Sequence, residues 1–244
     1  METLRSMVNG FLTKIVSFHH EQERFMIEFS VKIAKESALN LDKFRKRPII
    51  GILRGINEEE LPPLVEVMIA SGLETVEITM NTAGAALLIK QLVELAAGRL
   101  NVGAGTVLDM VSLHSALDAG ATFVVTPTLV PDVTVYCAEN GVPVFPGALT
   151  PTEIHRAFEA GATMVKVFPA NLFGPAYFKD IRGPFADIEL LACGGVNASN
   201  AAAYFEAGAS AVAFGGSIFN SDWLRTGEFQ KIGDAIRELV DAVH

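Results

Sequence analysis

The sequence predicts an α/β protein that folds as one (β/α)8 barrel, the TIM barrel, with a helical extension at its N-terminus. The chain has 244 residues, half of them apolar, which suits a single-domain barrel of roughly 250 residues. From about residue 48, amphipathic helical stretches alternate with short runs rich in Val, Ile or Phe. Glycines placed to end those helices recur at intervals of about 20 to 26 residues, the length of one strand-plus-helix unit: Gly72, Gly98, Gly120, Gly141, Gly161, Gly183 and Gly208.

The first strand of this series begins near Pro48, so the count of units is eight. Short apolar strands that alternate with helices favour a closed parallel barrel. An open, doubly wound sheet fits less well, because no G-x-G-x-x-G fingerprint follows the first strand. Two helix starts support the register: Asn57 with Glu60, and Thr150 with Glu153, have the spacing of an N-cap and an acidic third position.

The N-terminal residues lie outside the repeat. We expect an extension over residues 1–40 and the barrel over residues 41–244. The stretch from Met26 to Phe44 has the pattern of one amphipathic helix that would close the bottom of the barrel. Residues 1–25 carry no pattern from which a role follows.

Composition excludes several classes of protein. A net charge of -9 argues against a nucleic-acid footprint, which needs a clustered basic face. Apolar runs are interrupted within about ten residues, short of the roughly 20 that span a bilayer, so no membrane helix is expected. No cleavable signal pattern begins the chain, and Cys137 and Cys193 have no disulfide or metal-site spacing. We therefore expect a cytoplasmic protein with two reduced thiols and no metal.

Two charged residues stand within predicted strands at inward-facing positions. In ETVEITMN (74–81) the apolar set Val76, Ile78 and Met80 should face the helices, which turns Glu77 into the barrel. In ATMVKVFP (162–169), Lys166 shares its parity with Met164 and Phe168 and also points inward.

A lysine amine among apolar groups loses part of the stabilisation of its charged form, so more of it is available to attack a carbonyl. Glu77 could then serve as the proton shuttle. The alternative is a buried ion pair that only orders the core.

Other strand ends supply candidate partners for a substrate. Arg54 follows the first strand and Thr106 the third, and a guanidinium and a hydroxyl would suit a carboxylate. Taken alone, Arg54 is better explained as a solvated surface residue. After the seventh and eighth strands, CGGVNASN and FGGSIFN place backbone N–H groups where barrels frequently bind phosphate, although such glycines can also simply make turns. The candidate phosphate cradle is Gly194, Gly195, Gly215, Gly216 and Ser217.

From about Pro48 to Phe219 the chain resembles the family of 2-keto-3-deoxy-6-phosphogluconate and 2-keto-3-deoxy-6-phosphogalactonate aldolases. The resemblance rests on an ordered set of motifs: ILRGI, VEITMN, GAGTVL, VTP, FPGALTPTE, VKVFPA, GP, GGV and GGS. It implies a class I enzyme without metal or organic cofactor, in which Lys166 forms a Schiff base and Glu77 is the acid and base. It also implies a phosphorylated 2-keto acid substrate with pyruvate as product, carbohydrate metabolism of the Entner-Doudoroff type, and a homotrimer.

Further substrate contacts implied by the resemblance are Arg54, Thr106, Asn81, Pro127, Phe168 and Cys193. Many gluconate-type members have arginine where this chain has Asn81, and the galactonate type resembles this chain there, so Arg54 would supply the cation instead. Cys193 stands where the gluconate type tends to have threonine, and a thiol cannot replace a strong hydroxyl hydrogen bond near C4. The C4 configuration of the substrate therefore stays open.

Two other functions remain possible from the residues. One is a different phosphate-binding barrel enzyme, such as a sugar-phosphate epimerase or a thiamine-phosphate-type synthase, in which lysine and glutamate act only as acid and base. The other is a catalytically silent barrel that binds a phosphorylated metabolite or a protein, since a fold alone does not determine function.

Overall fold

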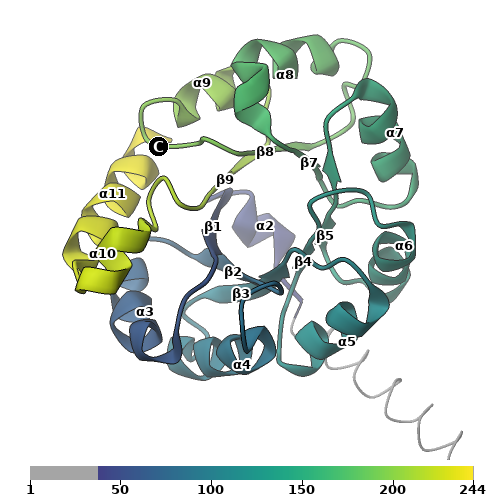
Figure 1. Ribbon diagram of the computed structural model, residues 1–244. Helices are drawn as coiled ribbons and strands as arrows, with labels where there is room; N and C mark the ends of the chain where they lie inside the picture. Colours follow the sequence, from purple (N-terminus) through teal and green to yellow (C-terminus); the bar gives the residue numbers. More distant parts are fainter. Residues whose placement is uncertain (1–37, 244) are drawn as a thin grey trace, which may run out of the picture.

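The computed structural model describes residues 38–243, and it confirms the predicted barrel: a ring of parallel strands surrounded by helices (Figure 1). The hydrogen-bonded order of the strands is β5-β4-β3-β2-β1-β9-β8-β7-β6. The two ends of this order, β5 and β6, are consecutive in the chain, so the sheet curls round until its ends meet. The strands are β1 (Ile49–Leu53), β2 (Thr75–Thr79), β3 (Asn101–Gly105), β4 (Val124–Val125), β5 (Val144–Phe145), β6 (Gly147–Ala148), β7 (Val165–Val167), β8 (Leu190–Cys193) and β9 (Ala211–Phe214).

The described residues form nine strands where eight were predicted, and Pro146 explains the difference. It lies between β5 and β6 and has no N–H to donate to a ladder, so one predicted strand is divided into two short ones. β5 pairs with β4, whereas β6 pairs with β7. The carbonyl of Pro146 still accepts a hydrogen bond from the N–H of Lys166 at 2.8 Å, which ties the two ends of the sheet together.

The helices connect successive strands and cover the outside of the ring (Figure 1). Both predicted helix starts are confirmed: Glu60 accepts a hydrogen bond from the N–H of Asn57, and Thr150 and Glu153 form a reciprocal capping box. Asn57 precedes a 3-10 turn, η1, which runs directly into α3. The helical elements are α2 (Leu41–Phe44), η1 (Glu58–Glu60), α3 (Leu61–Ala70), α4 (Ala85–Ala96), α5 (Met110–Asp118), α6 (Pro131–Asn140), α7 (Pro151–Glu159), η2 (Ala170–Leu172), α8 (Gly174–Arg182), α9 (Ala201–Glu206), α10 (Ser221–Thr226) and α11 (Phe229–Ala242).

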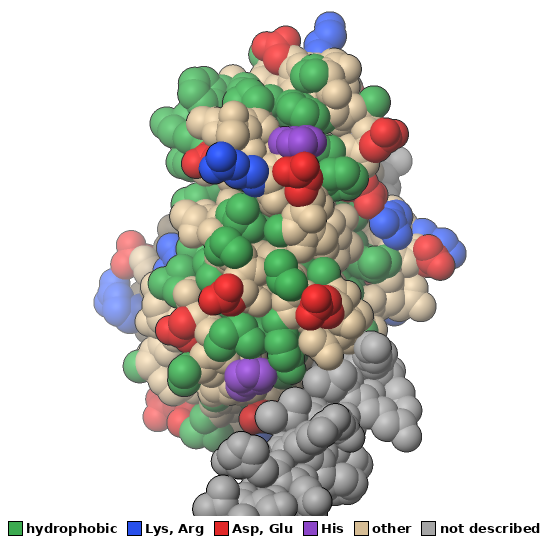
Figure 2. All heavy atoms as spheres, turned by 90° about the vertical axis from the view of Figure 1, so that its right-hand side faces the viewer, with side chains coloured by type: hydrophobic (Ala, Val, Ile, Leu, Met, Phe, Trp, Pro, Cys, Tyr) green, Lys and Arg blue, Asp and Glu red, His purple; other side chains and the backbone are tan. Residues whose placement is uncertain are grey.

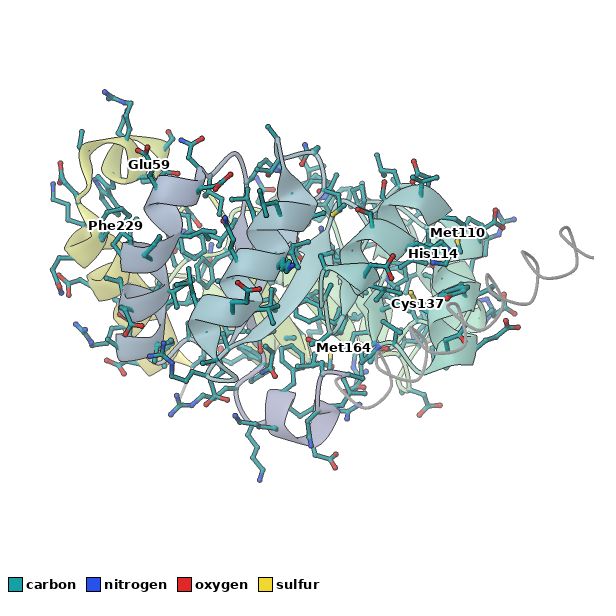
Figure 3. All side chains as sticks on the ribbon, turned by 90° about the horizontal axis from the view of Figure 1, so that it is seen from below. Glu59, Met110, His114, Cys137, Met164 and Phe229 are labelled. Carbon is teal, nitrogen blue, oxygen red and sulfur yellow. The ribbon has the colours of Figure 1, made fainter. Side chains whose placement is uncertain are left out.

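The buried apolar residues form two cores, one on each side of the sheet. The larger core lies between the strands and the helices and includes Val76 and Ile78 of β2, as their parity predicts. The smaller core fills the inside of the barrel: Leu39, Phe44, Ile50, Phe123, Val125, Phe145, Met164, Leu191, Cys193, Ala211 and Ala213. Figure 3 shows Met164 toward the end of the barrel at which α2 lies.

The short helix α2 closes that end of the barrel, although it is much shorter than the predicted helix. Asn40 caps it by accepting a hydrogen bond from the N–H of Lys43, so the helix begins at Leu41 and residues 38–40 are not helical. The predicted part before residue 38 lies outside the described residues. Phe44 packs against Phe145 with 6.0 Å between ring centroids, and the N–H of Leu39 donates to the carbonyl of Thr122. These contacts seal the bottom of the barrel with apolar groups.

The outer helices carry scattered charges among apolar side chains, as the face in Figure 2 shows. Within residues 38–243, no helix has both the length and the hydropathy needed to cross a membrane.

Candidate functional site

The carboxylate of Glu77 lies inside the barrel, as the strand parity predicted. Glu77 is paired with Ile52 of β1 and Gly103 of β3, and only 2 % of its surface is exposed. Burial raises the pKa of Glu77 to about 7, while the positive charges of Lys166 and Arg54 oppose the rise. A carboxyl group with such a pKa can both accept and release a proton near neutral pH.

Lys166 reaches the same lumen from the opposite part of the ring. It is the middle residue of β7, paired with Gly147 and Leu191, and 6 % of its surface is exposed. Its Nζ atom lies 5.0 Å from the centroid of the Phe168 ring, which has the same parity. Lys166 and Glu77 are thus both buried on inward-facing positions of the barrel strands, and the charge of the lysine lowers the pKa of the carboxyl group.

Arg54 and Cys193 complete a cluster of four titratable groups. Cys193 ends β8, is buried, and has a thiol whose pKa is raised by burial, with Lys166 opposing the rise. Arg54 lies one residue beyond β1 with its charge close enough to act on both Glu77 and Cys193. The cluster therefore combines an amine, a guanidinium, a carboxyl group and a thiol.

A pocket of about 450 Å³ opens above this cluster at the carboxyl ends of the strands. Nine of the predicted site residues line it: Arg54, Lys166, Phe168, Cys193, Gly194, Gly195, Gly215, Gly216 and Ser217. Five others that sequence reasoning missed also line it: Ile52, Ala213, Phe219, Asn220 and Ser221. Ile52 and Ala213 are inward-facing residues of β1 and β9, and strand parity could have identified them.

The glycine loops after β8 and β9 form one wall of the pocket. Gly194 and Gly195 have φ values of +105° and +72°, which a residue with a side chain rarely adopts. A side chain on Gly216 would meet no atom within 4 Å, so the space beside this residue is open. The Ser217 hydroxyl donates a 2.7 Å hydrogen bond to the carbonyl of Val196. That bond links the loop after β8 to the loop after β9.

Four predicted site residues lie outside the pocket lining: Glu77, Thr106, Asn81 and Pro127. Thr106 is half-buried, with φ at +53°, and directly follows Gly105, which packs against Glu77. Asn81 is exposed beyond the end of β2. The backbone of Pro127 lies against Gly147, the β6 neighbour of Lys166. Among residues 38–243, no three His, Cys, Asp or Glu side chains gather as metal ligands.

Comparison with known proteins matches most of the chain to one family. The family model for KDPG and KHG aldolases matches residues 41–235. The chain is 34% identical over 200 residues to a probable 2-dehydro-3-deoxy-6-phosphogalactonate aldolase of Rhizobium meliloti, covering 82% of this chain and 94% of the relative. It is also 34% identical over 194 residues to a 2-dehydro-3-deoxy-phosphogluconate aldolase of Treponema pallidum, covering 79% and 90%.

Among solved structures, one named "Native KDPGal structure" superposes with a TM-score of 0.75 at 31% identity. The match covers 80% of this chain and 93% of that one. The two relatives named for different sugar configurations are thus each 34% identical to the chain. The match of family model, relatives and fold leads to one conclusion: this chain belongs to the KDPG and KHG aldolase family.

Proposed function

We propose that this protein is a carbon–carbon lyase that cleaves 2-dehydro-3-deoxy-6-phosphogluconate, or its galactonate epimer, to pyruvate and D-glyceraldehyde 3-phosphate. One observation carries the proposal: Lys166 and Glu77 are both buried in one lumen, below a pocket that opens at the carboxyl ends of the strands. A primary amine beside a carboxyl group of pKa about 7 is the combination that imine chemistry requires.

In the first half of the proposed reaction, the neutral amine of Lys166 adds to the C2 ketone of the substrate. The resulting carbinolamine loses water and becomes an iminium ion, with Glu77 carrying the protons. Arg54 binds the C1 carboxylate, because a guanidinium can offer two parallel N–H donors to one carboxylate. The phosphate lies against the backbone N–H groups of the loops after β8 and β9.

In the second half, Glu77 takes the proton of the C4 hydroxyl, directly or through a water. The C3–C4 bond breaks, its electron pair moves into the iminium to give an enamine, and glyceraldehyde 3-phosphate leaves. Protonation of the enamine at C3 and hydrolysis of the iminium then release pyruvate and restore the amine. Every proton taken in cleavage is returned in these last steps, so the cycle needs no outside reductant or oxidant.

Trapping with borohydride tests the imine. Pyruvate and sodium borohydride should modify the wild-type protein once, at Lys166, as located by peptide mass spectrometry. Lys166→Arg keeps the charge but should give no adduct. Lys179→Arg is the matched control, because Lys179 is exposed on α8, and it should be modified like the wild type. A wild-type protein without an adduct on Lys166 refutes the mechanism.

A coupled assay for pyruvate release separates the aldolase from the other candidate functions. A sugar-phosphate epimerase or a synthase would bind the phosphorylated ligand without an imine, and a silent binder would release no pyruvate. Rates on the gluconate and galactonate epimers, compared side by side, determine the C4 configuration that the enzyme prefers. A non-phosphorylated 2-keto-4-hydroxy acid in the same assay tests how far the reaction depends on the phosphate.

The proposal also covers where the protein works in the cell and how many chains it contains. The catalytic unit is the barrel over residues 41–244, with residues 1–40 as an extension, and the enzyme works in the cytoplasm as a homotrimer without metal or organic cofactor. The family resemblance supports the trimer. Sedimentation equilibrium should give a mass of three chains of 26.1 kDa, and a monomer would contradict this part of the proposal.

A further inference from the structure

A small network of buried hydroxyl groups joins the loop after β1 to the end of β2. The N–H of Gly55 donates to the Thr82 hydroxyl at 3.0 Å, and that hydroxyl lies 3.0 Å from the hydroxyl of Thr79. Thr79 is completely buried and 6 % of the surface of Thr82 is exposed. Thr79 is also the next inward-facing residue after Glu77 on β2. The network thus connects the strand that carries the carboxylate to the loop that carries Arg54.

The side chain of Arg54 has no anchor of its own in the part of the chain that the structure describes. Its guanidinium forms no hydrogen bond and no ion pair within residues 38–243. Its charge nevertheless acts on Glu77 and Cys193, so it belongs to the cluster. Arg54 is exposed and lines the pocket, and its side chain has several rotatable bonds. The position of the backbone at residues 53–55 therefore sets which part of the pocket the guanidinium can reach.

The sheet itself does not hold this loop. The last residue pair between β1 and β2 is Leu53 with Ile78, one residue before Arg54. Gly55 has φ at +68° with open space around it, so its own conformation is weakly constrained. The Thr82 hydroxyl is the acceptor that satisfies its N–H. Gly55 is exposed, so without that acceptor its N–H would turn to water, and the loop would lose the hydrogen bond that ties it to the end of β2.

We propose that Thr82 is a positioning residue: by holding the N–H of Gly55, it sets the Arg54 guanidinium against the carboxylate of the substrate. The inference rests on the proposed function, in which Arg54 binds that carboxylate. Thr79 supports the arrangement by orienting the Thr82 hydroxyl. Thr82 touches neither the substrate nor the reacting atoms, so its effect must pass through Arg54.

The test measures the pyruvate concentration that half-saturates the borohydride-trapped adduct on Lys166. Thr82→Val keeps the shape of the side chain but removes the acceptor, and Thr82→Ser restores it. We expect Thr82→Val to raise the half-saturating concentration roughly three- to tenfold, the effect of one lost hydrogen bond, and Thr82→Ser to stay within about twofold of the wild type. Pyruvamide has no carboxylate, so its trapping should respond little to Thr82→Val.

A double-mutant cycle shows whether the effect passes through Arg54. In an Arg54→Ala background, Thr82→Val should cause no further loss, because the two changes remove the same contact. If the effects of Arg54→Ala and Thr82→Val were fully additive, the proposal would be overturned. It would also be overturned if Thr82→Val left the half-saturating pyruvate concentration unchanged. Thr82→Ala takes the place of the valine variant if that protein does not fold, as judged by circular dichroism. If the wild type forms no adduct, the proposed function fails as well; if it does and Thr82→Val matches it, only the role of Thr82 fails.

Discussion

The Glu77 carboxyl group packs directly on the backbone of Gly105: a methyl group on Gly105 would lie 2.1 Å from Oε1 and 2.6 Å from the carboxyl carbon. The two residues are on neighbouring strands, β2 and β3, and Gly105 pairs with Thr79. Glycine at this position leaves the space that the carboxyl group occupies. The identity of residue 105 therefore decides where the acid–base group lies.

Gly105→Ala should disturb the reaction more than the fold. The clash is with the end of a side chain, which can rotate away, so we expect a loss of stability below about 1 kcal/mol. Because the carboxyl group leaves its place, kcat should fall about a hundredfold. Pyruvate release and urea unfolding measure the two effects.

Gly103→Ala is the matched control for that variant. A methyl group there would lie 2.4 Å from the ring of Phe123, which is fully buried and packs edge-on against Phe145. This ring has nowhere to move, so we expect a loss of about 1–3 kcal/mol of stability and near-normal activity per folded molecule. Similar activity losses in both variants would show that the contact with Glu77 has no special role.

The pH dependence of activity should follow the titration of Glu77. Its pKa is raised to about 7 by burial, and the ionised form is the one that takes the C4 hydroxyl proton. The rate of cleavage at low substrate concentration should therefore rise as the pH increases through about 7. Glu77→Gln should lower kcat by a factor of about 10² to 10⁴ and remove this inflection. If the inflection persisted in the glutamine variant, it would belong to another group.

The same shift predicts how stability depends on pH. Between pH 4.5, the ordinary pKa, and about 7, the folded protein holds a proton on Glu77 that the unfolded chain has lost. The resulting stabilisation is fully present below pH 4.5 and is lost as the pH rises through 7. Its upper limit is about 3 kcal/mol. The difference in unfolding free energy between wild type and Glu77→Gln should accordingly fall from pH 4.5 to 7.5; a constant difference would contradict the burial argument.

The proposal that the glycine loops after β8 and β9 bind the phosphate can be tested at Gly216, where an added side chain meets no protein atom within 4 Å. Gly216→Val should fold normally but occupy the space proposed for the phosphate, raising KM for the phosphorylated substrate about tenfold or more. KM for a non-phosphorylated 2-keto-4-hydroxy acid should change little. In Ser217→Ala, the lost hydroxyl donates to Val196 and not to the ligand, so a change of only a few-fold is expected. If Gly216→Val raised KM equally for both substrates, these loops would not be the phosphate-binding part of the pocket.

Much of the fold and the centre of the site could be predicted because they follow from local patterns. The spacing of helix-ending glycines indicates repeated strand–helix units, and six of the seven named glycines have positive φ; Gly183, at −55°, does not. Alternation along a strand places Lys166 and Glu77 inside, since neighbouring side chains point to opposite faces of a sheet. Pro146 shows the limit of this reasoning, because its effect on the ladder depends on which strands are its neighbours.

The sequence by itself determined the barrel, the inward direction of Lys166 and Glu77, and the order of motifs that places the chain in its family. Only the tertiary structure decided which groups from distant units touch: Gly105 with Glu77, and Thr82 with Gly55. It also decided the pKa of Glu77, which depends on burial and on the charges of Lys166 in β7 and Arg54 after β1. The physical reason is the distance along the chain over which each effect acts. Which side of a strand a side chain faces is set within a few residues, whereas the contacts and electric fields in the lumen exist only once the ring has closed.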